Sequence, residues 1–139
     1  MTAYVVEDSP AHEDIYFLDH RLGEYNRPRS GAADSRFLCI FVRDEGGEIL
    51  AGLHGWTWGG CLEVKYLWVR EDLRRQGHGT ALLQAAEAEA RARGCRRAFV
   101  ATHSFQAPGF YPKHGYRVVG QYDDYPEGHV QYFLRKELE

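Results

Sequence analysis

The chain has 139 residues, of which 44% are hydrophobic and 27% are charged, and its formal net charge at pH 7 is −3. One domain of this length buries enough surface for a hydrophobic core, so residues 1–139 are expected to form a single domain. The slightly negative charge argues against a general nucleic-acid surface, and the absence of a targeting sequence or long apolar span favours a cytoplasmic protein with no membrane partner.

The first third of the chain predicts one short strand, one helix and one loop. Ser9 suits a helix cap and Pro10 suits the first helical position. Apolar residues then recur at helical spacing until Gly23, which favours a helix end there. The expected elements are therefore a strand at residues 3–6, a helix from about 10 to 22 and a loop at 26–35.

Three apolar runs separated by glycine turns follow. They are typical of strands in an antiparallel meander, with turn signals at residues 44–47 and 59–60. The predicted strands are 37–42, 49–58 and 61–69.

A strand, a basic glycine loop and a helix follow each other directly over residues 67–83. Gly77 and Gly79 leave the backbone free of Cβ atoms, and a helix N-terminus carries partial positive charge, so the pattern predicts a phosphate site beside Arg74 and Arg75. A tight turn with solubilising arginines explains the same residues. The spacing matches neither the P-loop nor the dinucleotide fingerprint.

The remaining elements alternate helix and strand. The helix after the loop ends at Gly94, and the pairs Glu87–Arg91 and Glu89–Arg93 have the favourable i,i+4 order. A helix between two strands predicts that strands 61–69 and 95–101 are parallel. The later predicted elements are a short helix at 106–114 and strands at 116–122 and 130–135.

Cysteines and histidines do not form a recognisable site. Cys39, Cys61 and Cys95 are isolated in apolar runs, so we interpret them as reduced core residues. No two histidines have a ligand-like spacing with a third partner, so no metal is expected.

Two segments carry a family resemblance. Residues 74–80, Arg-Arg-Gln-Gly-His-Gly-Thr, resemble the acetyl-CoA pyrophosphate loop of the GNAT acyltransferases, and residues 107–116 resemble that family's second motif, Ala-x-x-x-Tyr-x-x-x-Gly-aromatic. The resemblance implies an α/β fold whose mixed central sheet is antiparallel at the start and has two splayed parallel central strands, with helices on both faces. It implies an acetyl-CoA-dependent N-acetyltransferase that acts on a primary amine of a small molecule or peptide.

The resemblance also implies which residues bind the cofactor. Backbone N–H groups of the loop would hold the pyrophosphate, and the backbone of the preceding strand would pair with the pantetheine amides. Where the family often has an asparagine on the pantetheine arm, this chain has Ser104. The implied cofactor-binding residues are Leu67, Trp68, Val69, Arg74, Arg75, Gln76, Gly77, His78, Gly79 and Thr80.

Two side chains are candidates for the chemistry. Tyr111 occupies the position of the family's general acid, although a core tyrosine beside Phe110 is the plain structural alternative. Glu63 is placed like the strand glutamate that serves as base in the histone-type branch. A surface pair with Lys65 explains Glu63 equally well, and many members have no dedicated base. Period-two alternation predicts that Glu63 shares a face with Lys65, Leu67 and Val69.

Other functions remain open at this stage. A CoA-binding regulatory or interaction module without efficient catalysis would keep the same loop. A nucleic-acid binder using the basic residues 91–97 is a remote alternative. Family members often pair, so a homodimer is one possible state of the chain.

Overall fold

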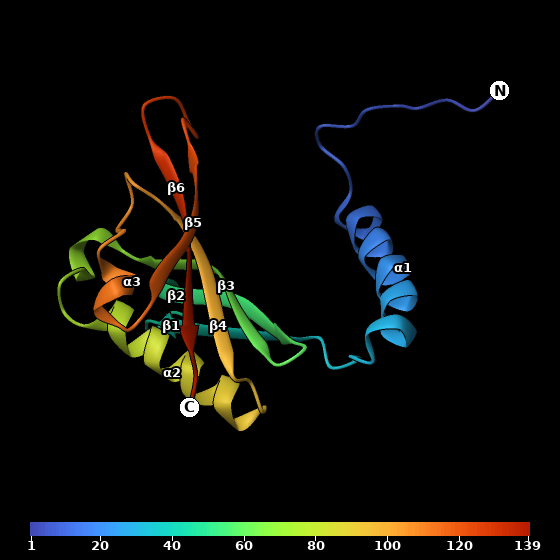
Figure 1. The fold of residues 1–139 in the computed structure, drawn as a ribbon. Coiled ribbons are helices and arrows are strands. Elements are labelled where there is room, and N and C mark those ends of the chain that lie inside the picture. Colours follow the sequence, from blue (N-terminus) through green and yellow to red (C-terminus); the bar gives the residue numbers. More distant parts are fainter. The chain divides into compact units, whose positions relative to one another are not determined.

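The computed structural model describes residues 1–139 and divides into two compact units, Met1–Ala33 and Asp34–Glu139 (Figure 1). The expectation that residues 1–139 are a single domain stays a prediction. None of the helices is long and apolar enough to cross a bilayer.

The first unit contains one helix, α1 (His12–Ser30). The helix passes through Gly23 and ends at Gly31, so the predicted end was wrong, as was the loop at 26–30. Gly31 has φ 71°, the left-handed conformation that stops a helix, whereas an interior glycine only weakens one. The strand predicted at residues 3–6 is absent, because a strand needs a hydrogen-bonded partner and this segment has none in its unit.

The second unit is built on one six-stranded sheet. The strands are β1 (Arg36–Arg43), β2 (Ile49–Trp58), β3 (Cys61–Val69), β4 (Arg97–His103), β5 (Arg117–Asp123) and β6 (Val130–Glu137). Their order in the sheet is β1-β2-β3-β4-β6-β5, and the expected antiparallel start and parallel β3–β4 pair are confirmed. The position of β6 between β4 and β5 was not predicted.

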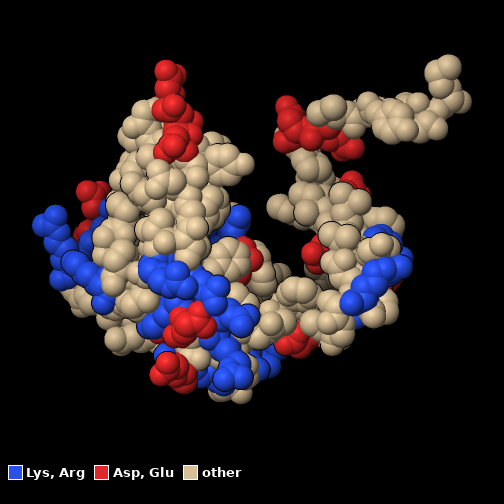
Figure 2. Space-filling model, viewed as in Figure 1, with Lys and Arg blue, Asp and Glu red and all other residues tan.

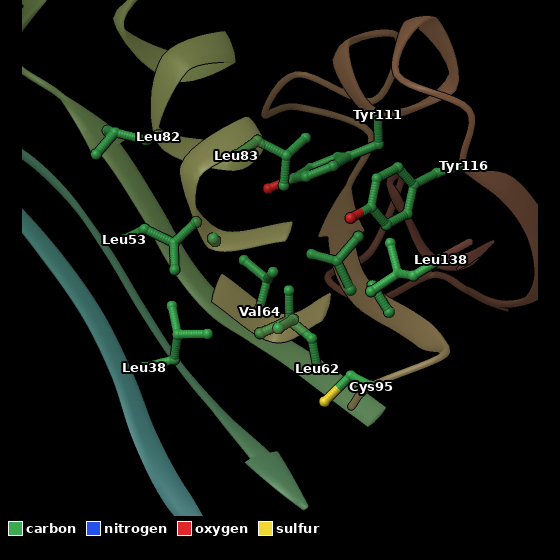
Figure 3. Packing of buried hydrophobic residues seen from close by; sticks show 14 of the residues in the cluster. Leu38, Leu53, Leu62, Val64, Leu82, Leu83, Cys95, Tyr111, Tyr116 and Leu138 are labelled. Carbon is green, nitrogen blue, oxygen red and sulfur yellow. The ribbon is translucent and has the colours of Figure 1, made fainter. Parts of the chain in front are cut away.

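Two helices, α2 (His78–Ala92) and α3 (Phe110–Lys113), pack on the same face of this sheet. Leucines of α2 and the tyrosines around α3 meet the inward side chains of the strands in one apolar cluster (Figure 3). The helix α3 is shorter than the predicted 106–114, because Pro108 disfavours helical backbone in the residue before it. The buried core includes Leu38, Leu53, Leu62, Val64, Leu83, Val100, Tyr111, Tyr116 and Leu134.

All three cysteines are free, but only one is a core residue. Cys95 is buried and Cys61 is half-buried, whereas Cys39 is exposed, so its predicted burial was wrong. Cys39 alternates with the buried Leu38 and therefore points away from the core, with its Sγ 3.2 Å from Nδ1 of His54.

A bulge in β3 changes which side chains face the core. His54 pairs with Tyr66 and Gly55 pairs with Val64, so Lys65 is an extra residue on β3. The bulge shifts the alternation by one, and Leu67 and Val69 pack on the same core as Val64. Glu63 lies between two buried neighbours and points to the other face. The prediction that it shares a face with Leu67 and Val69 was wrong for this reason.

We expect Gly55→Ala to destabilise the second unit strongly. A Cβ on Gly55 would overlap the carbonyl oxygen of Glu63 at the bulge, and neither strand can move without breaking the ladder. Overpacking of this kind costs about 3 kcal/mol. Urea denaturation should show the loss, with Gly109→Ala as a control because a Cβ there meets open space at a negative φ. Equal urea midpoints for Gly55→Ala and Gly109→Ala would show that the bulge can adjust to a side chain at Gly55.

Candidate active site

The two central strands separate halfway along their length. Pairing of β3 with β4 begins at Cys61 and Arg97 and ends at Val64 and Val100. Beyond that point β3 pairs only with β2, and β4 only with β6. The edge of β3 at residues 65–69 is therefore not hydrogen-bonded to β4, and a free strand edge of this kind can pair with the amide groups of a ligand.

The loop that follows β3 presents unpaired backbone donors. Gly77 has φ 85° and caps α2, and the first bond within the helix runs from the Ala81 N–H to the Gly77 carbonyl at 2.9 Å. The N–H groups of His78, Gly79 and Thr80 consequently have no partner within the helix. Together with the positive end of α2, they fit an anion such as a diphosphate.

Side chains of the loop brace its shape. Arg74 donates from Nε to the Val69 carbonyl at 2.8 Å, and Gln76 donates from Nε2 to the Asp72 carbonyl at 3.3 Å. Arg70 pairs with Asp72 at 2.6 Å and holds the pKa of that carboxyl below its usual range. Arg75 is exposed, with φ 65°. The loop therefore uses Arg74 and Gln76 internally and leaves its backbone and Arg75 toward solvent.

The two sequence motifs are in contact. A Cβ on Gly79 would lie 3.4 Å from the ring of Phe110, so this ring packs against the start of α2. Thr80 Oγ1 also lies 3.1 Å from Nε2 of His114. The glycine loop and the segment around Tyr111 thus form one structural site, although sequence reasoning did not foresee the Thr80–His114 contact.

Tyr111 is a core residue by burial, with 7% of its surface exposed. Its ring packs edge-on against Phe110 and Tyr116, with centroid distances of 5.1 and 5.6 Å. Burial raises the pKa of Tyr111 to about 12, so the phenol keeps its proton at neutral pH. These properties fit a proton donor as well as a packing residue.

Glu63 lies at the level where the two strands begin to separate. Its cross-strand neighbours are Trp56 on β2 and Phe99 on β4. Desolvation raises the pKa of Glu63, and the charge of Lys65 opposes that effect. Because Tyr111 belongs to the core on the α2 face, Glu63 and Tyr111 lie on opposite sides of the sheet.

The sheet face opposite α2 is unusually aromatic. His54 lies at its centre, with ring centroids of Phe37, Trp56 and Tyr66 at 5.7, 5.8 and 5.6 Å. The side chain of Trp68 is also on this face, so only its backbone is left for the predicted cofactor contact. We call this surface the aromatic face; strand register assigns to it Phe37, Phe41, His54, Trp56, Tyr66, Trp68, Phe99 and Phe133.

Other candidate residues have structural partners. The Ser104 hydroxyl accepts a hydrogen bond from the Val130 N–H at 3.0 Å. Arg93 donates from Nη1 to the Phe37 carbonyl and to the Thr57 hydroxyl, so it tethers α2 to the sheet. Acidic side chains gather at the tip of the β5–β6 hairpin, at the top of the view (Figure 2). No group of three or more histidine, cysteine or acidic side chains is placed to hold a metal ion.

Comparison with known proteins agrees with this geometry. Residues 4–116 match the model of the acetyltransferase (GNAT) family. The chain is 45% identical over 117 residues to a blasticidin-S acetyltransferase of Streptomyces morookaense, covering 79% of this chain and 84% of that protein. It is 37% identical over 133 residues to an acetyltransferase of Agrobacterium fabrum, covering 96% and 97% of the two chains.

A solved structure extends the likeness to three dimensions. The crystal structure of an acetyltransferase from Bacillus cereus superposes with a TM-score of 0.79 at 32% identity, covering 96% of this chain and 98% of that one. The fold and the site therefore define a transferase of acyl groups. The chain belongs to the GNAT family of acetyltransferases and is an N-acetyltransferase.

Proposed function

We propose that the chain uses acetyl-CoA to acetylate a primary amine of a small molecule by direct attack. The observation that supports this most is the helix N-terminus with free N–H groups at the mouth of two separating parallel strands. Acetyl-CoA would supply the acetyl group as a thioester. The backbone of residues 75–80 would bind its diphosphate, and the edge of Leu67, Trp68 and Val69 would pair with its amides.

The two faces of the sheet suggest separate approaches for the two substrates. The glycine loop and Tyr111 belong to the α2 face, and Glu63 belongs to the aromatic face. Backbone pairing between β3 and β4 stops after Val64 and Val100, and we propose that an opening connects the two faces there. A thioester held from one side and an amine arriving from the other would meet at this opening, where a backbone N–H of β3 can stabilise the developing oxyanion.

Tyr111 is the proposed proton donor to the departing sulfur. Because burial raises the pKa of Tyr111 to about 12, the phenol still carries its proton when the thiolate departs. A thiolate leaving into the same desolvated surroundings is also more basic than it is in water. The pKa of the phenol and the pKa of the departing thiol are thus both raised, so burial does not by itself prevent proton transfer between them.

Glu63 is the proposed base for the acceptor amine. A lysine-type amine with a pKa near 10.4 is almost fully protonated at pH 7, so a carboxylate that removes a proton, directly or through water, raises the reactive fraction. The raised pKa of Glu63 makes it a stronger base than an ordinary carboxylate.

Glu63→Gln should lower kcat/KM at pH 7 by about a hundredfold, because the amide cannot accept the proton. The ratio of kcat/KM between the unmodified enzyme and Glu63→Gln should fall toward pH 10, where more of the amine loses its proton to solvent. Rates measured from pH 6 to 10 check this, with Glu48→Gln as a control in the exposed turn before β2. A defect of equal size at every pH would indicate that Glu63 only shapes the site, and no defect would leave the enzyme without a dedicated base.

The acceptor we propose to test first is blasticidin S. This suggestion rests on the 45% identity with the Streptomyces protein of that name. An aromatic face around a single desolvated carboxylate suits a flat molecule that carries a protonated amine. Free CoA should be released with blasticidin S, and the comparison panel should include polyamines, aminoglycosides and peptide N-termini. CoA binding without release for any of these amines would favour the module without efficient catalysis.

A further inference from the structure

A buried carboxylate on α2, Glu87, is hydrogen-bonded to Tyr116, which follows α3, and to Lys136 on β6. Glu87 is only 3% exposed. Its Oε2 accepts a hydrogen bond from the Tyr116 hydroxyl at 2.8 Å, and its Oε1 accepts one from Nζ of Lys136 on β6 at 2.7 Å. Arg91 lies farther away, at 3.8 Å. Glu87, Tyr116 and Lys136 will be called the brace.

Stability alone gives a weak reason for the brace. The Glu87 side chain is only 5% exposed and that of Lys136 is 21% exposed, so the cost of desolvating the carboxylate offsets much of the attraction between them. What a satisfied, partly buried pair does supply is a fixed geometry, because each atom has one favourable partner. In this case the fixed atom is the hydroxyl of Tyr116.

Gly115 is part of the same arrangement. It has φ 89°, and a Cβ there would lie 3.3 Å from Cε of Lys136. The lysine chain therefore runs close to a position whose positive φ favours glycine, and its ammonium also lies 5.6 Å from the centre of the Tyr116 ring. Gly115 and Tyr116 are the last two residues of the second motif, so the brace gives both a physical role in this chain.

The brace reaches Tyr111 through two direct contacts. The ring centroids of Tyr116 and Tyr111 lie 5.6 Å apart, and the rings meet edge to face. Figure 3 shows the two side chains next to each other in the core. The Tyr116 N–H also donates to the Tyr111 carbonyl at 3.2 Å. Tyr111 lies on α3, which has only four residues and cannot hold its own conformation. The direction of the phenol thus depends on what packs against it.

We propose that Tyr116, Glu87 and Lys136 are positioning residues that fix the Tyr111 hydroxyl at the reacting sulfur. The inference rests on the proposed function, because it requires that Tyr111 donates the proton. None of the three residues needs to touch a substrate. Without its hydroxyl, the Tyr116 ring still packs in the core but is no longer held by Glu87, so it can move and let Tyr111 move with it. A displacement of about 1 Å of the Tyr111 hydroxyl is enough to slow proton donation severely.

The test is a double-mutant cycle of Tyr116→Phe and Tyr111→Phe, with kcat measured at saturating amine. Tyr116→Phe alone should lower kcat about tenfold and leave KM for acetyl-CoA within about twofold. In the Tyr111→Phe background the same change should have almost no effect, because there is no hydroxyl left to position. A purely structural role would instead lower kcat by the same factor in both backgrounds.

A second variant covers the case in which Tyr116→Phe folds poorly. Lys136→Met keeps the straight side chain over Gly115, and a cavity of about 250 Å³ beside Glu87 and Lys136 gives water access to the released carboxylate. It should also lower kcat several-fold without raising KM for acetyl-CoA. Glu89→Gln on the same helix, an exposed carboxylate paired with Arg93, is the control and should keep full activity.

The outcomes separate the two proposals. If Tyr111→Phe is as fast as the unmodified enzyme, Tyr111 is not the acid, and both the acid role and the brace are overturned. If Tyr111→Phe is slow while the effects of Tyr116→Phe are absent, or multiply independently, the acid role stands and the brace is overturned. Only a slow Tyr116→Phe whose effect vanishes without the Tyr111 hydroxyl supports the brace.

Discussion

Tyr111→Phe should lower kcat about a hundredfold to a thousandfold and leave the affinity for acetyl-CoA almost unchanged. The change removes one oxygen from a ring that is otherwise held by Phe110 and Tyr116, so the packing is kept and only proton donation is lost. Stopped-flow or coupled measurement of CoA release gives kcat, and calorimetry gives the affinity. A parallel fall in both quantities would show that Tyr111 supports the fold and not the chemistry.

The pH dependence of the same pair of enzymes adds a second test. Because burial raises the pKa of Tyr111 to about 12, the phenol stays protonated across the accessible alkaline range. The kcat of the unmodified enzyme should therefore show no alkaline decline up to about pH 10, where an exposed tyrosine would be half ionised. A decline in kcat centred near pH 9 that disappears in Tyr111→Phe would contradict the burial argument, since it would mean that Tyr111 ionises readily.

Gly77→Val should weaken acetyl-CoA binding about a hundredfold. Gly77 has φ 85°, a conformation that a β-branched side chain strongly disfavours, so the loop has to change its path at the start of α2. The N–H groups of His78 and Gly79 then no longer converge on one point. Calorimetric titration with CoA measures the loss.

A matched control separates the loop geometry from general damage. Gly47→Val also places a valine at φ 85°, but in the turn between β1 and β2. Both variants carry similar backbone strain, so they should lose similar stability, whereas only Gly77→Val should lose CoA affinity. Equal affinity in the two variants would remove the glycine loop from cofactor binding.

The core of the fold was predictable because local signals agreed there. Glycine turns separated the strands of the meander, and the helix from the glycine loop to Gly94 had clear start and stop signals, which the structure confirms. The end of α1 was not predicted correctly, because Gly23 and Gly31 look alike in sequence and only the backbone shows which one adopts positive φ. The place of β6 between β4 and β5 depends on contacts distant in sequence.

The site was predictable in part for similar reasons. The glycine loop and the tyrosine motif carry recognisable spacings, and the structure brings them into contact through Gly79 and Phe110. Simple alternation could not predict that Glu63 lies on the face opposite Leu67 and Val69. The extra residue Lys65 moves every later side chain of β3 to the other face. The buried partners of Glu87 were hidden as well, since its i,i+4 spacing to Arg91 resembles an ordinary surface pair.

A crystal structure of the enzyme with CoA is the most direct test of the proposed chemistry. It should show diphosphate oxygens within hydrogen-bond distance of the N–H groups at the start of α2, with the pantetheine arm along residues 67–69. The sulfur should lie between the separated strands, within about 3.5 Å of the Tyr111 hydroxyl. CoA bound elsewhere on the chain, or a sulfur far from Tyr111 with the glycine loop empty, would contradict the proposal.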